Sequence, residues 1–181
     1  MPRPTPTSTI HRPLEVPLPP LAPDAPPARR EDIDGGHIYL LRGALHPRGC
    51  RAIIAFAERQ GFAPAGLAIG GDRYRENERL RIYRYAEGQY FRPHVDVQME
   101  LPGGGQTRAS LMVYLNDDFE GGQTRFFARK PRGSSRKRNN PVTHSVVPER
   151  GSALVFDHLR LHEGAAVSRG VKYAIRSDLI Y

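Results

Sequence analysis

Three side chains of types that bind metal ions stand at spacings that let them share one ion. His94 and Asp96 are separated by a single residue in the run FRPHVD at 91–96. On a β-strand both side chains point to the same face, because side chains alternate along a strand. His162 follows a second apolar run, 153–156, and supplies a third ligand from another part of the sheet. Two histidines and one carboxylate hold Fe(II) and leave positions open for other ligands.

Six short motifs surround these residues in a fixed order. The first, YAEGQYFRPHVD at 85–96, is similar to the Y-x-x-G-x-x-[FY]-x-x-H-x-D signature of the prolyl 4-hydroxylase family. The resemblance covers about residues 80–181 and implies an Fe(II)- and 2-oxoglutarate-dependent oxygenase. The later motifs resemble the family's following strands in this order: YLND at 114–117, EGGQTRF at 120–126, GSALVF at 151–156, HEG at 162–164 and GVKY at 170–173.

The resemblance also implies which residues hold 2-oxoglutarate. Lys172, ten residues after His162, corresponds to the family's basic residue on the last strand, which pairs with the C5 carboxylate. A dicarboxylate inside a barrel needs a fixed cation, because a buried unpaired carboxylate is costly. The alternative for Lys172 is a solvated lysine on a sheet face. Tyr85 corresponds to a tyrosine that hydrogen-bonds the cosubstrate, or else packs as a core aromatic. Ser110 stands where the family usually has threonine and is expected to line the same pocket.

Two nearby residues compete with this assignment. His158 precedes His162 by four residues, but ten residues beyond it stands Ser168, which cannot anchor a carboxylate. The His-Glu-Gly context of the family also belongs to His162. Arg176 is either a second cation near the cosubstrate or an exposed charge on the strand. The carboxylate of Asp96 implies hydroxylation, because relatives that halogenate carry a small residue at that position.

The elements that must position these residues are mostly β-strands behind one helix. After Pro47, apolar residues at 50, 53, 54 and 57 form one helical stripe, and Gly61 ends it. Short strands at this spacing, separated by Gly- and Asn-rich turns, favour a sandwich or jelly roll with helical support. The family resemblance implies a double-stranded β-helix (a cupin-like jelly roll) with iron at one mouth. The predicted strands are 37–41, 80–85, 89–94, 109–115, 124–127, 145–147, 153–156 and 171–181.

Composition divides the 181 residues into a leader and one domain. Ten of the 17 prolines fall within residues 1–27, so we expect this arm to join neither a sheet interior nor a regular helix. We interpret 1–30 as an extended or disordered leader, or else as an arm that wraps the domain or caps a partner. The domain then covers 31–181, with an irregular basic insertion at about 129–143. Seven basic residues and no acid lie within 125–138, which accounts for most of the net charge of +8. This segment is either a solvated loop or a docking patch for an acidic partner.

The resemblance implies hydroxylation of an aliphatic carbon, with O2 as cosubstrate, release of succinate and CO2, and ascorbate as a possible support. The substrate is a peptidyl residue, as in prolyl hydroxylases, or a free amino acid or other small metabolite. An oxidative nucleic-acid demethylase is the rival, because the 125–138 segment would suit phosphates. No aromatic-rich loop for reading bases accompanies that segment, so nucleic acid is the weaker alternative. The lone Cys50 and the lack of a spanning or signal segment predict a cytoplasmic protein without membrane contact. Oligomeric state is not set by the sequence.

Overall fold

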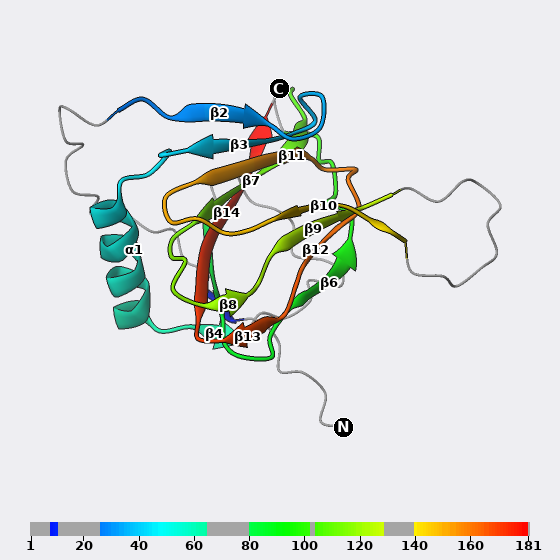
Figure 1. The fold of residues 1–181 in the computed structure, drawn as a ribbon. Helices are drawn as coiled ribbons and strands as arrows, with labels where there is room; N and C mark the ends of the chain where they lie inside the picture. The colour runs from blue at the N-terminus through cyan, green and yellow to red at the C-terminus, as the bar shows by residue number, and fades with distance from the viewer. Residues whose placement is uncertain (1–7, 11–25, 65–79, 102–103, 129–139, 181) are drawn as a thin grey trace.

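The computed structural model describes residues 8–10, 26–64, 80–101, 104–128 and 140–180 (Figure 1). Within them, antiparallel strands form two main sheets, with one helix beside the larger sheet. The large sheet has the order β2-β3-β11-β7-β14-β5-β1-β4. Its strands are β1 (Ser8–Ile10), β2 (Arg29–Asp32), β3 (Ile38–Arg42), β4 (Ala63–Pro64), β5 (Arg81–Tyr85), β7 (Thr107–Tyr114), β11 (Ala153–Asp157) and β14 (Lys172–Ile180).

The small sheet has the order β10-β9-β12-β6 and carries both candidate histidine ligands. Its strands are β6 (Phe91–His94), β9 (Thr124–Phe127), β10 (Val142–Val146) and β12 (His162–Gly164). A two-stranded ribbon joins β8 (Glu120–Gly121) to β13 (Val167–Arg169). This mostly β architecture of antiparallel sheets with one supporting helix among the described residues confirms the predicted fold class.

The core between the two sheets follows from alternation along the strands. Tyr114 on β7 and Phe156 on β11 pack against Phe126 on β9, and the Phe126 and Phe156 rings meet edge to face at 5.2 Å. On β14 the same alternation places Lys172 and Arg176 on this inner face of the large sheet. The inner face therefore holds the candidate cosubstrate residues as well as apolar core.

The outer face of the large sheet is covered by α1 (Pro47–Gln60). Cys50, Ile53 and Ala57 pack on Ile82 of β5 and Ile175 of β14. The helix begins after His46, whose side chain accepts a hydrogen bond from the Arg48 N–H, and has proline at its start. It ends at Gly61, whose N–H donates to the carbonyls of Ala57 and Glu58. The predicted helix, its stripe and its end residue are all observed.

Part of the proline-rich leader forms a strand of the large sheet. Ser8–Ile10 forms β1, which pairs with β5 on one side and β4 on the other, with Thr9 opposite Tyr83. These three residues lie in the proline-free stretch 7–12, so each retains a backbone donor for the ladder. The expectation that the arm joins no sheet interior is therefore wrong at β1, which lies between β5 and β4, whereas β2 begins at Arg29 on the edge of the sheet. Residues 1–7 and 11–25 lie outside the described ranges.

Two further predictions concern the bounds of the basic insertion and the absence of a membrane-spanning segment. The basic insertion was expected at about 129–143, but β10 already begins at Val142. Residues 129–139, which hold most of the basic cluster, lie outside the described ranges. Among the described residues, no helix is long and apolar enough to cross a membrane.

Candidate metal centre

The two histidines of the candidate triad are brought together by strand pairing. β6 and β12 run antiparallel, and His94 and His162 are partners in their register. Their rings lie 4.3 Å apart, measured between centroids. Phe156 and Phe126 pack against the His162 ring at 4.5 and 6.1 Å, which holds it within the core. The site therefore depends on two segments that are distant in sequence and adjacent in the small sheet.

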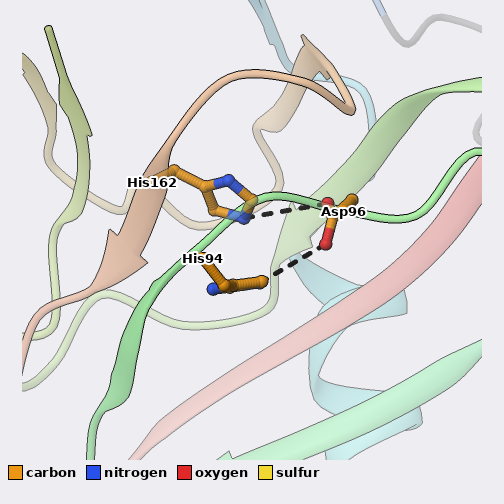
Figure 2. A group of neighbouring side chains, drawn as sticks. All are labelled: His94, Asp96 and His162. Carbon is orange, nitrogen blue, oxygen red and sulfur yellow. Dashed lines mark ion pairs between the residues drawn. The ribbon is translucent and has the colours of Figure 1, made fainter. Parts of the chain in front are cut away.

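Asp96 completes the cluster just beyond the end of β6 (Figure 2). Its backbone N–H donates to the carbonyl of His158 at 2.9 Å, which ties it to the loop that leads into β12. His94 Nε2 lies 3.3 Å from Asp96 Oδ1, and His162 Nε2 lies 3.7 Å from Asp96 Oδ2. One ligand atom from each residue lies within 4.8 Å of the others. Figure 2 shows both imidazoles directed at the carboxylate.

Backbone carbonyls set which tautomer each imidazole adopts. His94 Nδ1 lies 2.9 Å from the carbonyl oxygen of Arg92, and His162 Nδ1 lies 2.8 Å from that of Arg160. A carbonyl only accepts, so each Nδ1 carries the proton and donates it. The lone pair is then on Nε2, the atom that faces Asp96. Such contacts fix the tautomer and orientation of metal-binding histidines.

The charges of the cluster also suit a cation. Burial lowers the pKa of His162 to about 4, so this imidazole is neutral at physiological pH, as a metal ligand must be. Burial by itself would raise the pKa of Asp96, but the contact with His94 and the charge of Arg176 outweigh it. The pKa of Asp96 is therefore well below its ordinary range, and the carboxylate stays ionised. Two imidazoles with one carboxylate are a donor set that fits Fe(II).

Two residues of the large sheet hold the Asp96 carboxylate from behind. Arg176 on β14 lies 2.7 Å from Oδ1, and the Ser110 hydroxyl on β7 donates to Oδ2. Ser110 is fully buried, so its hydrogen bond is shielded from water. Its predicted place in the cosubstrate pocket remains a prediction, since the contact observed is with the candidate metal ligand. Arg176 is paired with Asp96 and lies 3.6 Å from Asp178, so it is not a free cation.

Lys172 is a buried cation without a carboxylate partner among the described residues. Its side chain is 3% exposed, and Nζ donates to the carbonyl of Gly122 at 2.6 Å. The rings of Tyr85 and Tyr114 lie 5.4 and 5.3 Å from Nζ. Burial lowers the pKa of Lys172 to about 7. The solvated alternative for Lys172 therefore does not describe its surroundings. A buried ammonium with one carbonyl acceptor favours an anionic ligand, because buried charges are normally paired.

Gly122 makes room for this lysine. Its φ is +67°, a left-handed conformation that favours glycine. A Cβ at this position would lie 3.1 Å from Lys172 Cδ and 2.8 Å from the ring of Phe119. Glycine therefore lets the carbonyl of this turn approach the ammonium.

The structure bears on the two alternatives for Tyr85 and on His158 as the alternative third ligand. Tyr85 is buried beside Lys172, and burial raises the pKa of its hydroxyl, so it stays neutral. It contacts the proposed anchor while also packing in the core. His158 is fully buried with Nε2 3.3 Å from Asp178, and it is not part of the three-residue cluster. The structure thus brings the imidazole of His162, and not that of His158, to His94 and Asp96.

Asn116 belongs to the YLND motif, and the sequence alone assigns it no role of its own, yet it bonds to the backbone of the two residues that flank Lys172. It is 6% exposed, and its side chain hydrogen-bonds on either side of Lys172. The signal in the sequence was its place after Tyr114 and Leu115 at a strand end, where a polar side chain is usually exposed. Its burial could be recognised only from the structure.

Comparisons with known proteins agree with this geometry. Residues 80–177, more than half of the chain, match the sequence profile described as the 2OG-Fe(II) oxygenase superfamily. The chain is 34% identical to probable prolyl 4-hydroxylase 3 of Arabidopsis thaliana over an aligned length of 115, and the alignment covers 54% of this chain and 40% of that protein. It is 35% identical to probable prolyl 4-hydroxylase 10 of the same plant, with the same coverage. The chain thus spans about two-fifths of the length of these curated relatives.

Solved structures show the same fold. A viral collagen prolyl hydroxylase from Paramecium bursaria Chlorella virus-1, in complex with 2OG, superposes with a TM-score of 0.56 at 22% identity. That alignment covers 80% of this chain and 95% of the viral one. A truncated form of the viral enzyme gives a TM-score of 0.55 at 23% identity, covering 87% and 94% of the two chains. With the profile match over the residues that carry the triad and Lys172, the chain belongs to the 2OG-Fe(II) oxygenase superfamily.

Proposed function

We propose that this chain is an Fe(II)- and 2-oxoglutarate-dependent hydroxylase. One observation carries the proposal: two histidines and one carboxylate form a cluster, and the same fold buries a lysine that has no carboxylate partner among the described residues. The first fits Fe(II), and the second fits one end of a dicarboxylate.

Each residue of the site then has a defined task. His94, Asp96 and His162 would hold the metal through two Nε2 atoms and one carboxylate. When bound, Fe(II) supplies dioxygen activation, in which one oxygen atom enters a substrate C–H bond and the other converts 2-oxoglutarate to succinate and CO2. Ser110 and Arg176 keep the carboxylate of Asp96 in one orientation. Lys172 would bind the C5 carboxylate, with Tyr85 against it.

The substrate class that we propose is a prolyl residue in a peptide. Its support is the similarity to proteins named as prolyl 4-hydroxylases, over the part of the chain that holds the site. A free amino acid is the second candidate. The basic 125–138 segment would suit an acidic peptide, but Arg125 already lies 3.5 Å from Glu163 within the domain. A cytoplasmic location stays a prediction that rests on the free Cys50.

The test is a succinate-release assay with Fe(II), 2-oxoglutarate and ascorbate. The substrate panel contains proline-rich peptides with and without acidic flanks, free proline, a pool of other free amino acids and a methylated oligonucleotide. We expect substrate-dependent succinate with the peptides and a mass increase of one oxygen atom on proline. Turnover of the oligonucleotide alone would overturn the substrate class. No 2-oxoglutarate consumption with any substrate, by protein that binds both Fe(II) and 2-oxoglutarate, would overturn the hydroxylase.

Cosubstrate binding is expected to depend on pH through Lys172. Below pH 7 the ammonium is present before binding, because the pKa of Lys172 is about 7. Above pH 7 the free amine is largely neutral and must take up a proton to pair with the C5 carboxylate. The Kd for 2-oxoglutarate should therefore rise with pH above 7, by up to about tenfold per unit. Calorimetry of Mn(II)-loaded protein, in buffers of different ionisation enthalpy, measures the proton directly.

We expect uptake of close to one proton at pH 8 and little at pH 6. The matched control is Lys172→Arg, whose guanidinium is charged throughout this range. It should bind with no such uptake. Equal uptake by the parent and Lys172→Arg at pH 8 would show that another group titrates.

A further inference from the structure

The backbone on both sides of Lys172 is held by one side chain. The amide of Asn116 donates from Nδ2 to the carbonyl of Val171 at 2.7 Å and accepts at Oδ1 from the N–H of Tyr173 at 2.7 Å. Lys172 lies between these two residues. A single side-chain amide thus forms the two hydrogen bonds that a neighbouring strand would form with the backbone flanking Lys172.

The hydrogen bonds of Asn116 lie where the regular pairing between β7 and β14 ends. The last pair between β7 and β14 is Tyr114 with Ala174, followed by one more hydrogen bond from the Leu115 N–H to the carbonyl of Tyr173. Beyond that point the chain after β7 no longer pairs residue by residue with β14. Strand ends open more easily than strand centres. Lys172 is the first residue of β14, so without Asn116 its backbone would lie at an unsupported end on this side.

The orientation of the amide is fixed by a third contact. Asn116 Nδ2 also donates to Asp118 Oδ1 at 2.8 Å. An ionised carboxylate only accepts, so the nitrogen must face Asp118 and the oxygen must face the Tyr173 N–H. The side chain is 6% exposed, so water does not readily replace these bonds. Asparagine supplies a donor and an acceptor from one short side chain, which neither aspartate nor alanine does.

We propose that Asn116 is the positioning residue for the cosubstrate anchor. By fixing the backbone from Val171 to Tyr173, it holds the Lys172 side chain against Gly122 and the two tyrosines, where the ammonium meets the C5 carboxylate. This inference rests on the proposed role of Lys172 in binding 2-oxoglutarate. It assigns to the asparagine of the YLN motif a part in cosubstrate affinity.

A purely structural role predicts something different. If Asn116 only supports the fold, its replacement lowers thermal stability and affects metal binding and cosubstrate binding alike. If it acts through Lys172, its replacement weakens 2-oxoglutarate binding and leaves the metal cluster unchanged. It also has no effect on cosubstrate affinity once Lys172 is absent, because residues that act as one unit are not additive.

The experiment is a double-mutant cycle of Asn116→Ala and Lys172→Ala. The Kd for 2-oxoglutarate is measured by calorimetry on Mn(II)-loaded protein, and Co(II) affinity is measured by visible absorption. Asn116→Ala removes two hydrogen bonds next to the anchor, so we expect its Kd to rise about 5- to 150-fold. Its Co(II) affinity should match that of the parent. In the Lys172→Ala background, the same change should alter the Kd by less than about twofold.

Ser152→Ala is the matched control. Ser152 is fully buried, and its hydroxyl donates to the carbonyl of Glu149 at 2.7 Å, away from the anchor. Ser152→Ala removes a buried hydrogen bond between a side chain and the backbone, as Asn116→Ala does. We expect a lower melting temperature and an unchanged Kd for 2-oxoglutarate.

If Asn116→Ala fails to fold, Asn116→Asp with Asp118→Asn takes its place in the cycle. This exchange keeps the acceptor for Tyr173 and the contact between residues 116 and 118, but sets a carboxylate oxygen against the Val171 carbonyl, where neither group can donate. It should therefore raise the Kd for 2-oxoglutarate. A parental Kd in this double variant would count against the proposal.

The outcomes distinguish the role of Asn116 from the proposed role of Lys172 in binding 2-oxoglutarate. An unchanged Kd in Lys172→Ala would overturn Lys172 as the anchor. Weak binding by Lys172→Ala with a parental Kd in Asn116→Ala would overturn only the role of Asn116. Equal weakening by Asn116→Ala with and without Lys172 would also overturn it, because Asn116 would then act by another route.

Discussion

Replacing His162 with alanine is expected to abolish Fe(II)-dependent turnover of 2-oxoglutarate. His162 contributes one of the three ligand atoms of the cluster, and its ring is held between Phe156, Phe126 and His94. Loss of a group that merely orients a ligand costs about 10- to 100-fold in metal affinity. Loss of the ligand itself should cost more than about 100-fold. Co(II) titration followed by visible absorption gives the affinity, and succinate release gives the activity.

The control for this experiment is the neighbouring histidine. His158→Gln keeps a polar side chain opposite Asp178 and removes the imidazole that the sequence offers as an alternative to His162 for the role of third ligand. It should bind Co(II) with an affinity close to that of the parent. His94→Ala and Asp96→Ala should lose binding as His162→Ala does. Normal metal affinity in His162→Ala together with its loss in His158→Gln would reverse the ligand assignment.

The second large effect is expected at Lys172. Lys172→Ala would leave the C5 carboxylate of bound 2-oxoglutarate buried without a counter-ion. Truncating one partner of a buried charge pair costs about 2–5 kcal/mol, which is roughly 30- to several-thousand-fold in affinity. We expect the Kd and KM for 2-oxoglutarate to rise by such a factor. Calorimetry on Mn(II)-loaded protein and succinate release at saturating Fe(II) measure the two quantities.

Two features of the structure sharpen this prediction. The metal cluster contains no atom of Lys172, so Co(II) affinity should stay near the parental value. Lys172→Arg should recover part of the binding, because a planar guanidinium replaces a compact ammonium beside the turn at Gly122. Arg176 is the alternative anchor, but it is already paired with Asp96. Normal 2-oxoglutarate binding by Lys172→Ala would return Arg176 to consideration.

The sequence predicts much of the fold because local chemistry determines it. The α1 stripe and its glycine end depend on residues close together in the chain, and both are observed as predicted. The spacing of His94 and Asp96 implies a shared side, and the structure places them on one cluster. The short strands β8, β12 and β13 could not be predicted, because two or three residues carry no periodicity.

Contacts between segments that are distant in the chain could not be predicted from the sequence for a different reason. Pairing of β1 with β5 depends on three proline-free residues inside a proline-rich arm, and composition averaged over the arm hides them. The contacts of Ser110 and Arg176 with Asp96 require the two sheets to face one another in a particular register. The buried amide of Asn116 is recognisable only when both of its backbone partners, 55 and 57 residues away, are in place.

The cross-strand pairing of His94 with His162 determines where the chain can gain or lose residues without separating the two imidazoles. A slip of one residue between β6 and β12 would turn a ligand to the opposite face. Changes in length are therefore excluded within these strands, whereas the connections between strands are free of this constraint. The β9–β10 connection leaves the small sheet next to β12, since the Phe127 N–H bonds to the Leu161 carbonyl just before His162. An insertion in a connection leaves His94 and His162 in register, so the chain can lengthen there while the candidate metal ligands stay paired.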